Sequence, residues 1–392
     1  MQMRRQASCE SGLRRAPACG SHRPPNPLRW HRQATTKGIG HVIVPHEKLQ
    51  DIALQLLRAG GSSETEAATV ADHLIGANLS GHDSHGMVML SPYVKSLKSG
   101  NLKPNHRHTV VSESGSFAVW DGTHCYGQVV ARDAMNWAID TAKKHGVAIH
   151  GLRNVHHIGR VGTYGELAAA AGLVSISFVN GYSGKPRVAP FRGKHGRYTT
   201  NPICIAVPGT TTTPPVILDF ATSVVALGKV RVAYNDKRQV VPGALIDSEG
   251  RPTTDPSVMY EDPIGAALPF GEHKGSGLAL ICDLLAGAVA GAGVMPGDTP
   301  PEHGIVNGWL TFVLDPTRLA TMPFVQAEID KMVSFVKSSP PIDPAAPVLV
   351  AGEPERIARE KRRRDGVYID TETWAQLVEA GKAVGININL AA

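Results

Sequence analysis

The chain has 392 residues, of which 42% are hydrophobic, enough for a large core in one large domain or two ordinary ones. The net charge of +6 resides in residues 1–39, whose eight Arg or Lys and one acid give +7 and leave −1 for residues 40–392. The body of the chain therefore lacks the basic character of a nucleic-acid-binding protein, and its apolar runs are too short to cross a bilayer.

Five cysteines stand far apart, at positions 9, 19, 125, 204 and 282, and no two of them form a CxxC pair. Their odd number argues against a disulfide framework. We therefore expect a reduced, intracellular protein with a cytoplasmic location.

Residues 1–39 predict a disordered basic tail, because they are rich in arginine, poor in acids and interrupted by Pro24, Pro25 and Pro27. The tail has no apolar segment of the kind found in secretory signals. Three interpretations stay open: an organelle transit peptide, a translation start placed too far upstream, and nucleic-acid binding.

The body begins near residue 39 with three helical patterns. Apolar residues between 49 and 57 recur at helical spacing until Gly60. Ser63 and Glu66 have the spacing of a capping box, which predicts a second helix from about residue 64 to Leu79. A third apolar stripe spans residues 88–97 and ends at Gly100. We predict that residues 40–115 form the N-terminal part of a helical domain.

The pattern changes near residue 116, where short apolar runs alternate with helical segments. The predicted strands are 117–120, 147–155, 174–180, 203–207, 216–220 and 309–314, and the predicted helices among them are 126–145 and 275–291. This alternation predicts an α/β domain over residues 116–317.

The chain then returns to helices, predicted at 325–338, 354–364 and 371–383, with a proline-rich spacer at 339–347. Residues 318–392 are therefore expected to complete the helical domain begun by residues 40–115. Pockets tend to form where such domains meet.

The stretch GHDSHGMVMLSPY, residues 81–93, places two imidazoles, a carboxylate and a hydroxyl beside an apolar run. His82, Asp83 and His85 have residue types that bind metals. Alternatively, His85 is an acid/base group oriented by Ser84, because imidazole titrates near neutral pH. The third interpretation is a polar helix start capped by Asp83 or Ser84.

A glycine-rich segment follows the strand predicted at 147–155. Gly159, Gly162 and Gly165 have the spacing GxxGxxG rather than GxGxxG, and residues 175–178 contain no acid. An ordinary Rossmann site is therefore not expected. Glycines at a helix start can receive phosphate, or simply make a tight turn, and both interpretations stay open.

Two further segments have the composition of a site. Asp219 ends a buried strand, where a carboxylate can hold ribose hydroxyls or cap a helix. Lys274 stands among glycines at the start of the long apolar helix, where it can meet phosphate or stay in solvent.

Taken together, these motifs resemble one family. The stretches GHDSHGMVMLSPYV, NVHHIGRVGTYGELAAAAG, YTTNPICIAVP, LDFATSVVALGKV and FGEHKGSGLAL occur in the order found in the type-2 malate/L-lactate dehydrogenase family of NAD(P)-dependent oxidoreductases. The resemblance covers about residues 40–390. The motifs are most similar to those of the hydroxycarboxylate dehydrogenases, which reduce 2-oxo acids such as aromatic pyruvates.

The resemblance implies a fold class and an assembly. The fold would be α/β, with a mixed-sheet nicotinamide-binding domain particular to the family rather than an ordinary Rossmann fold, and a helical domain built from both chain ends. The protein would be a homodimer with its sites near the subunit contact.

The resemblance also implies site residues. His85 would give or take the proton at the substrate oxygen, Ser84 would be its relay neighbour, and His157 would be a catalytic base or a cofactor contact. The residues implied for NAD, with NADP possible as the cofactor, are His157, Gly159, Arg160, Gly181, Asp219, Phe220, Ala221, His273, Lys274, Gly352 and Glu353. No metal is implied.

Two departures from the family bear on the substrate. Many relatives read SHGxxR, and that arginine grips the substrate carboxylate, whereas this chain has Met89. The substrate residues considered are Met89 itself, whose apolar side chain leaves room for a larger substrate, with Tyr93, Thr200, Asn201 and a nearby arginine as candidates for the carboxylate. Some imine-reducing relatives carry an acid where this chain has Lys229.

We therefore expect an NAD(P)H-dependent enzyme that reduces 2-oxo acids to 2-hydroxy acids and catalyses the reverse oxidation, with a small-molecule substrate and no nucleic-acid or membrane partner. The alternatives are a malate/lactate, ureidoglycolate or cyclic-imine oxidoreductase of the same family, and a homologue that binds nucleotide without chemistry.

Overall fold

The computed structural model describes residues 41–182, 185–295 and 304–389. The predicted basic tail lies outside these residues. No helix among them combines the length and apolar character needed to span a bilayer.

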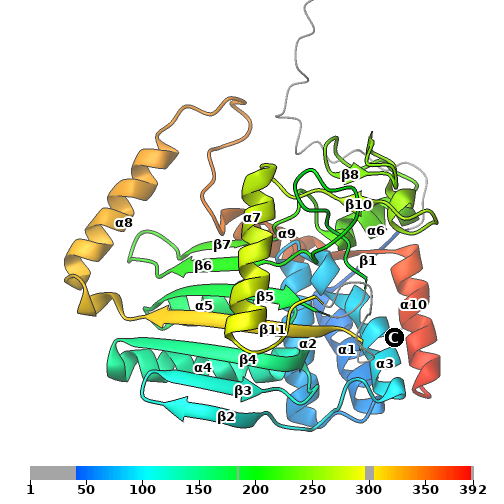
Figure 1. Ribbon diagram of the computed structural model, residues 1–392, viewed down its shortest axis with the longest axis horizontal. Coiled ribbons are helices and arrows are strands. Elements are labelled where there is room, and N and C mark those ends of the chain that lie inside the picture. Colours follow the sequence, from blue (N-terminus) through cyan, green and yellow to red (C-terminus); the bar gives the residue numbers. More distant parts are fainter. Residues whose placement is uncertain (1–40, 183–184, 296–303, 390–392) are drawn as a thin grey trace, which may run out of the picture. The chain divides into compact units, whose positions relative to one another are not determined.

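A seven-stranded mixed sheet organises the middle of the chain (Figure 1). Only β3 and β4 run parallel, and every other neighbouring pair is antiparallel. The expectation of an α/β fold with a mixed sheet is confirmed. In spatial order the strands are β2 (Thr109–Ser114), β3 (Phe117–Asp121), β4 (Val147–His156), β11 (Val306–Leu314), β5 (Val174–Gly181), β6 (Ile203–Val207) and β7 (Val216–Phe220).

The sheet is covered on both faces. Helices α4 (Gly127–His145) and α5 (Gly162–Ala170) pack on one face, and α7 (His273–Cys282) crosses the other face and continues as the π-helix η4 (Asp283–Val289) (Figure 1). Strand β11 enters between β4 and β5 and is buried along most of its length, with Trp309 fully enclosed. A continuous apolar run suits a strand covered on both sides.

A second apolar core joins the two ends of the chain. Helices α1 (His46–Ala59), α2 (Glu64–Leu79), α3 (Leu90–Ser99) and α10 (Thr371–Ala383) pack around it. Strand β1 (His41–Val44) pairs antiparallel with β12 (Val367–Asp370), so residues more than 300 positions apart share one core.

The start of α2 departs from the predicted capping box. Ser63 Oγ accepts the Glu66 amide at 3.4 Å, as expected, but the reciprocal bond is absent because Glu66 Oε2 accepts the Asn105 amide at 2.9 Å. The Ser63 amide donates instead to Asn105 Oδ1 at 2.7 Å. Asn105 satisfies the donor that the local motif would have used.

The sequence patterns did not predict several short elements. A three-stranded sheet forms from β8 (Leu245–Ile246), β9 (Pro252–Thr253) and β10 (Ala266–Ala267), each of only two residues. Helix α6 (Leu227–Asn235) and the 3-10 helix η3 (Pro256–Met259) lie beside it and share a small core. Two residues are too few to show the alternation that identifies a strand.

The remaining helices agree with the predictions to within a few residues. They are α8 (Met322–Lys337) and α9 (Glu353–Asp365). The division into domains at residues 116 and 317 stays a prediction.

Candidate active site

The segment 81–93 follows the end of α2 as two short 3-10 helices, η1 (Asp83–His85) and η2 (Met87–Met89). The Asn78 side chain holds both: its Oδ1 accepts the Met87 amide at 2.8 Å, and its Nδ2 donates to Asp83 Oδ1 at 2.7 Å. A Cβ on Gly86 would come within 2.1 Å of that Oδ1, so the close approach requires glycine. The sharp turn between η1 and η2 thus has a side-chain brace.

Helix α9, from the far end of the chain, fixes this segment from outside. Arg362 Nη2 donates to Asp83 Oδ2 at 2.9 Å, and Nη1 contacts Oδ1 of the same carboxylate. His82 Nε2 lies 3.2 Å from Glu355 Oε1. These α9 residues and Arg359, whose Nε donates to Ser80 Oγ at 2.8 Å, occupy one helical face.

This arrangement bears on the three interpretations of the motif. Asp83 is bound by Arg362 and Asn78. Its neighbours His82, Ser84 and His85 line the adjacent cavity, whereas Asp83 does not. Within the described residues, no three His, Cys, Asp or Glu side chains are grouped as metal ligands. Residues of this motif therefore have different roles: Asp83 anchors the turn, and His85 faces the cavity.

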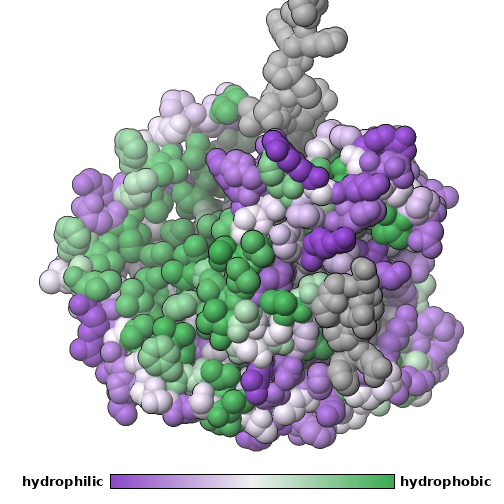
Figure 2. Space-filling view, in the orientation of Figure 1, coloured by the Kyte–Doolittle hydropathy of each residue, from purple (hydrophilic) through white to green (hydrophobic). Residues whose placement is uncertain are grey.

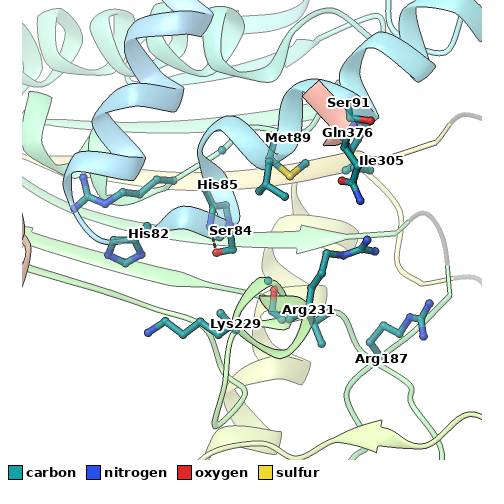
Figure 3. A pocket seen from close by; sticks show the side chains of 18 of the residues that line it. His82, Ser84, His85, Met89, Ser91, Arg187, Lys229, Arg231, Ile305 and Gln376 are labelled. Atoms are coloured by element: carbon teal, nitrogen blue, oxygen red, sulfur yellow. Dashed lines mark hydrogen bonds between the residues drawn. The ribbon is translucent and has the colours of Figure 1, made fainter. Parts of the chain in front are cut away.

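His85 lies between a hydroxyl and a second imidazole. Its Nδ1 is 2.9 Å from Ser84 Oγ, and its ring stacks on His157 with centroids 5.5 Å apart and planes 16° apart. Figure 3 shows Ser84 and His85 side by side at the cavity wall. A Cβ on Gly228, in α6, would lie 2.1 Å from Ser84 Cβ, so α6 closes directly onto the pair.

A buried hydrogen-bond chain leads from Gln128 through Tyr93 to His157. Gln128 Nε2 donates to the Tyr93 hydroxyl at 2.6 Å, and that hydroxyl is 2.7 Å from His157 Nδ1. Because the Tyr93 oxygen already accepts from Gln128, its own proton is free to go to Nδ1. In that arrangement a neutral His157 would carry its proton on Nε2.

Burial keeps both imidazoles neutral. It lowers the pKa of His85 to about 4, with smaller electrostatic contributions from His82 and Arg160. Burial also lowers the pKa of His157 well below its ordinary value, and His85 adds to this effect. At neutral pH, His85 is therefore a proton acceptor in the unliganded protein.

The glycine-rich loop is held by a third histidine. His73 Nε2 accepts the Arg160 amide at 2.8 Å, and a Cβ on Gly159, whose φ is +74°, would come within 2.3 Å of that nitrogen. Asp219 Oδ2 accepts the Gly162 amide at 2.8 Å and lies 3.6 Å from Arg160 Nε. Burial raises the pKa of Asp219, and Arg160 opposes that shift.

One cavity of about 1060 Å³ adjoins these groups. A dinucleotide and a small acid fit in this volume. Among the residues expected at the site, those lining it are Ser84, His85, Met89, Gly159, Arg160, Thr200, Asp219, Phe220 and Ala221. Its charged lining is mainly cationic: Lys95, Lys98, Arg160, Arg187, Lys229 and Arg231 against Asp219, Glu372 and Glu379.

Other expected site residues lie behind the cavity wall. His157 and Tyr93 are behind His85, and Tyr93 is fully buried. Asn201 is also fully buried, and its Nδ2 donates to the Ala279 carbonyl at 2.9 Å and to Asp283 Oδ2 at 2.7 Å. Its side chain therefore braces α7 and η4.

Four of the later cofactor candidates lie near β7, the edge strand that carries Asp219, and the fifth, Gly181, ends β5. The Phe220 ring contacts Phe270, which precedes the exposed His273 and Lys274 at the start of α7. On the outer edge, the Ile217 amide donates to the Ala351 carbonyl at 3.3 Å, beside Gly352. Glu353 pairs with Lys337, and Gly181 packs near Thr199.

Sequence reasoning missed the residues that support the site from a distance. Asn78, Gln128, Glu355 and Arg362 lie in ordinary helical stretches, where a polar side chain is expected to face solvent. The only local signal was the repeated arginine pattern of α9, which by itself indicates a solvated helix face.

The chain is similar in sequence to known dehydrogenases. The family model described as malate/L-lactate dehydrogenase matches residues 44–378. Hydroxycarboxylate dehydrogenase B of Escherichia coli (strain K12) is 42% identical over 342 residues, which cover 87% of this chain and 94% of that protein. The L-lactate dehydrogenase of Cupriavidus necator is 35% identical, over 86% of this chain and 97% of its own length.

Solved structures give the same result. A structure described as that of a candidate malate/lactate dehydrogenase from E. coli superimposes with a TM-score of 0.84 at 41% identity, covering 88% of this chain and 96% of that one. The sulfolactate dehydrogenase of Methanocaldococcus jannaschii superimposes with a TM-score of 0.77 at 35% identity, covering 88% and 98%.

The contact between α9 and η1 predicts a measurable loss on substitution. Arg362→Met should lower the free energy of unfolding by about 1–2 kcal/mol, less than for a fully buried pair because both side chains are partly exposed. It should also lower turnover, because the turn that carries His85 loses its anchor. Urea unfolding and a turnover assay would measure the two effects.

The matched control is Arg363→Met, the next residue on the exposed face of α9. Equal unfolding midpoints for the two variants would show that the Asp83–Arg362 pair does not support the site.

Proposed function

Because the chain belongs to the malate/L-lactate dehydrogenase family of NAD(P)-dependent 2-hydroxy acid dehydrogenases, we propose that it reduces 2-oxo acids to 2-hydroxy acids and catalyses the reverse oxidation. The observation that carries the proposal is the position of His85, which faces a large cationic cavity while hydrogen-bonded to Ser84. Hydroxycarboxylate dehydrogenase B, 42% identical, supports the same substrate class.

The proposed role of His85 is proton transfer at the substrate oxygen. In oxidation, its neutral imidazole takes the hydroxyl proton; in reduction, its imidazolium returns a proton to the carbonyl oxygen. Ser84 Oγ can accept the Nδ1 proton of that imidazolium, which fixes the ring orientation. His157, whose ring stacks on that of His85, is proposed to support the acid/base group from behind.

The residues around the cavity fit a nicotinamide dinucleotide. The cavity is large enough, and its cationic lining suits phosphates. We propose that Gly159, Arg160 and the segment Asp219–Ala221 hold the cofactor, with His273, Lys274, Gly352, Glu353 and Gly181 as further candidates. When bound, the nicotinamide supplies or accepts the hydride.

The proposed substrates are 2-oxo acids with large side chains, including aromatic pyruvates. Met89 lines the cavity, and its apolar side chain offers contact area where many relatives place an arginine. Lys229 also lines the cavity, at the position where some imine-reducing relatives carry an acid.

Activity assays test this function directly. The purified protein should reduce aliphatic and aromatic 2-oxo acids with NADH or NADPH and should prefer them to a cyclic imine, while ureidoglycolate should be a poor substrate for oxidation. His85→Asn should lower kcat by about 100- to 10 000-fold while the reduced cofactor still binds, because only the proton transfer is lost.

The control is Lys361→Gln, an exposed change on α9 outside the cavity, which should leave kcat unchanged. Near-normal turnover by the His85→Asn variant would remove the mechanism. Nucleotide binding without turnover of any 2-oxo acid would favour a non-catalytic homologue.

The lowered pKa of His85 predicts opposite pH profiles for the two directions. The group is neutral above about pH 4, so kcat/KM for oxidation should stay flat from pH 8 to pH 6. Reduction needs the protonated form, so its kcat/KM should rise about tenfold per unit as pH falls through the same range. A plateau of the reduction profile below pH 6.5 would instead indicate a histidine of ordinary pKa.

We also propose a homodimer. Figure 2 shows hydrophobic side chains gathered over α7 and the strands beside it. Helix α8 has no buried residue; Asp330 tethers it to Thr210 and Thr213, while Phe335 is 73% exposed. An apolar surface of this extent is typical of an interface. The exposed apolar residues of β5, α7, η4 and α8 are Ile176, Leu280, Ile281, Leu284, Val289, Phe324, Met332 and Phe335.

Light scattering after size exclusion tests the assembly. The protein should elute with the mass of two chains, and Met332→Glu with Phe335→Glu should shift it toward one chain. Lys361→Glu, a charge change on α9, is the control. A wild-type mass of one chain would contradict the proposed dimer.

A further inference from the structure

We propose that Arg231, with Arg187 beside it, holds the carboxylate of the substrate in place of the family arginine that Met89 replaces. This inference rests on the proposed function, since it assigns a second contact to the same substrate. It also explains how a cavity that lost one arginine can still orient a 2-oxo acid.

Arg231 has the right place in the fold. It stands three residues after Gly228, and so on the same face of α6 that closes onto Ser84. Figure 3 shows Arg231 extending toward the side of the cavity where Met89 and Gln376 lie, whereas Lys229 points the other way, to the side of His82. Of these two neighbouring cations, only Arg231 is directed across the space that faces Met89.

Both arginines contact the segment Met259–Tyr260. The Arg231 guanidinium carbon lies over the Tyr260 ring, 5.3 Å from its centroid, and Arg187 Nη1 donates to the Met259 carbonyl at 2.6 Å. Burial raises the pKa of the Tyr260 hydroxyl, and both guanidinium groups oppose that rise, as expected if both charges lie near it. All three side chains line the cavity that contains His85.

The positive charges of the Arg187 and Arg231 guanidinium groups are not neutralised by an ion pair within the described residues. Arg160, by contrast, is compensated by Glu166 and Asp219. Across the residues that the structure describes, neither Arg187 nor Arg231 forms an ion pair with a carboxylate. A guanidinium presents two parallel N–H donors that match the two oxygens of a carboxylate. Two guanidinium groups without a carboxylate partner in a partly enclosed cavity therefore favour an anionic ligand.

The cavity wall around Met89 is partly apolar, and this bears on the rest of the substrate. Val88, Met89, Ile305, Ala380 and Ala383 line the cavity, with the polar side chains of Ser91 and Gln376 beside Met89 and Ile305 (Figure 3). A carboxylate held by Arg231 leaves this wall to the side chain of the substrate. The arrangement therefore favours 2-oxo acids with a bulky apolar side chain over small or doubly charged ones.

A phosphate of the cofactor presents similar chemistry, so the test must separate the two anions. The methyl ester of phenylpyruvate lacks the negative charge of the carboxylate and carries one additional methyl group. The wild-type protein should prefer the acid, and Arg231→Gln should lower kcat/KM for the acid by about 10- to 100-fold while changing that for the ester little. NADH affinity, measured by fluorescence, should stay unchanged.

Two variants control this comparison. Arg363→Gln makes the same chemical change on the exposed face of α9 and should alter neither constant. Arg231→Lys keeps the charge without the paired donors and should recover part of the preference for the acid. Adding Met89→Arg to Arg231→Gln should restore the reduction of pyruvate but not that of phenylpyruvate, because the new arginine fills the apolar side.

The outcomes separate the two hypotheses. If the wild type reduces 2-oxo acids but Arg231→Gln keeps its preference for the acid, the carboxylate contact is wrong and the function stands. A loss of NADH affinity with an unchanged preference would place a cofactor phosphate at Arg231 and overturn the inference. A wild type without 2-oxo acid reduction would overturn both.

Discussion

The position of His85 depends on an ion pair between Asp83 and Arg362, residues 279 positions apart in the chain. A turn of two consecutive 3-10 helices has little hydrogen bonding of its own to define one conformation. The carboxylate of Asp83 supplies what is missing, because it joins the turn to α9 through Arg362 and to α2 through Asn78. Neighbouring bridges from Glu355 and Arg359 reinforce the same contact. The acid/base group is thus carried by a segment that the end of the chain holds in place.

The electrostatics of the site follow from this packing. Three buried histidines, His73, His85 and His157, lie close together. Burial and their mutual repulsion disfavour a positive charge on any of them, so all three are neutral in the unliganded protein. The uncompensated positive charge of the cavity resides instead in lysine and arginine side chains at its wall. An anionic ligand would offset their repulsion and favour protonation of His85. Substrate binding and the protonation needed for reduction are therefore coupled in this arrangement.

Many elements could be predicted because their signals are local. The strands at 203–207 and 216–220 and the helix at 371–383 have the predicted bounds, since apolar runs and capping residues lie within the elements themselves. The failures occur where the partner is distant. The Glu66 carboxylate does not close the capping box, because it accepts the backbone amide of Asn105, which is distant in sequence. The two-residue strands β8 to β10 exist only through pairing with each other, so no pattern along the chain reveals them.

The sequence by itself determined the motifs, their order along the chain, and the histidine and hydroxyl that occur together in segment 81–93. These are properties of neighbouring residues, and their resemblance to a family makes them specific. Only the tertiary structure decided that Asp83 binds Arg362 rather than a ligand, that Asn201 braces a helix rather than lining the cavity, and that Arg231 faces Met89. The physical reason is that a polar side chain has several possible partners, and the choice among them depends on which distant element packing brings within hydrogen-bond distance.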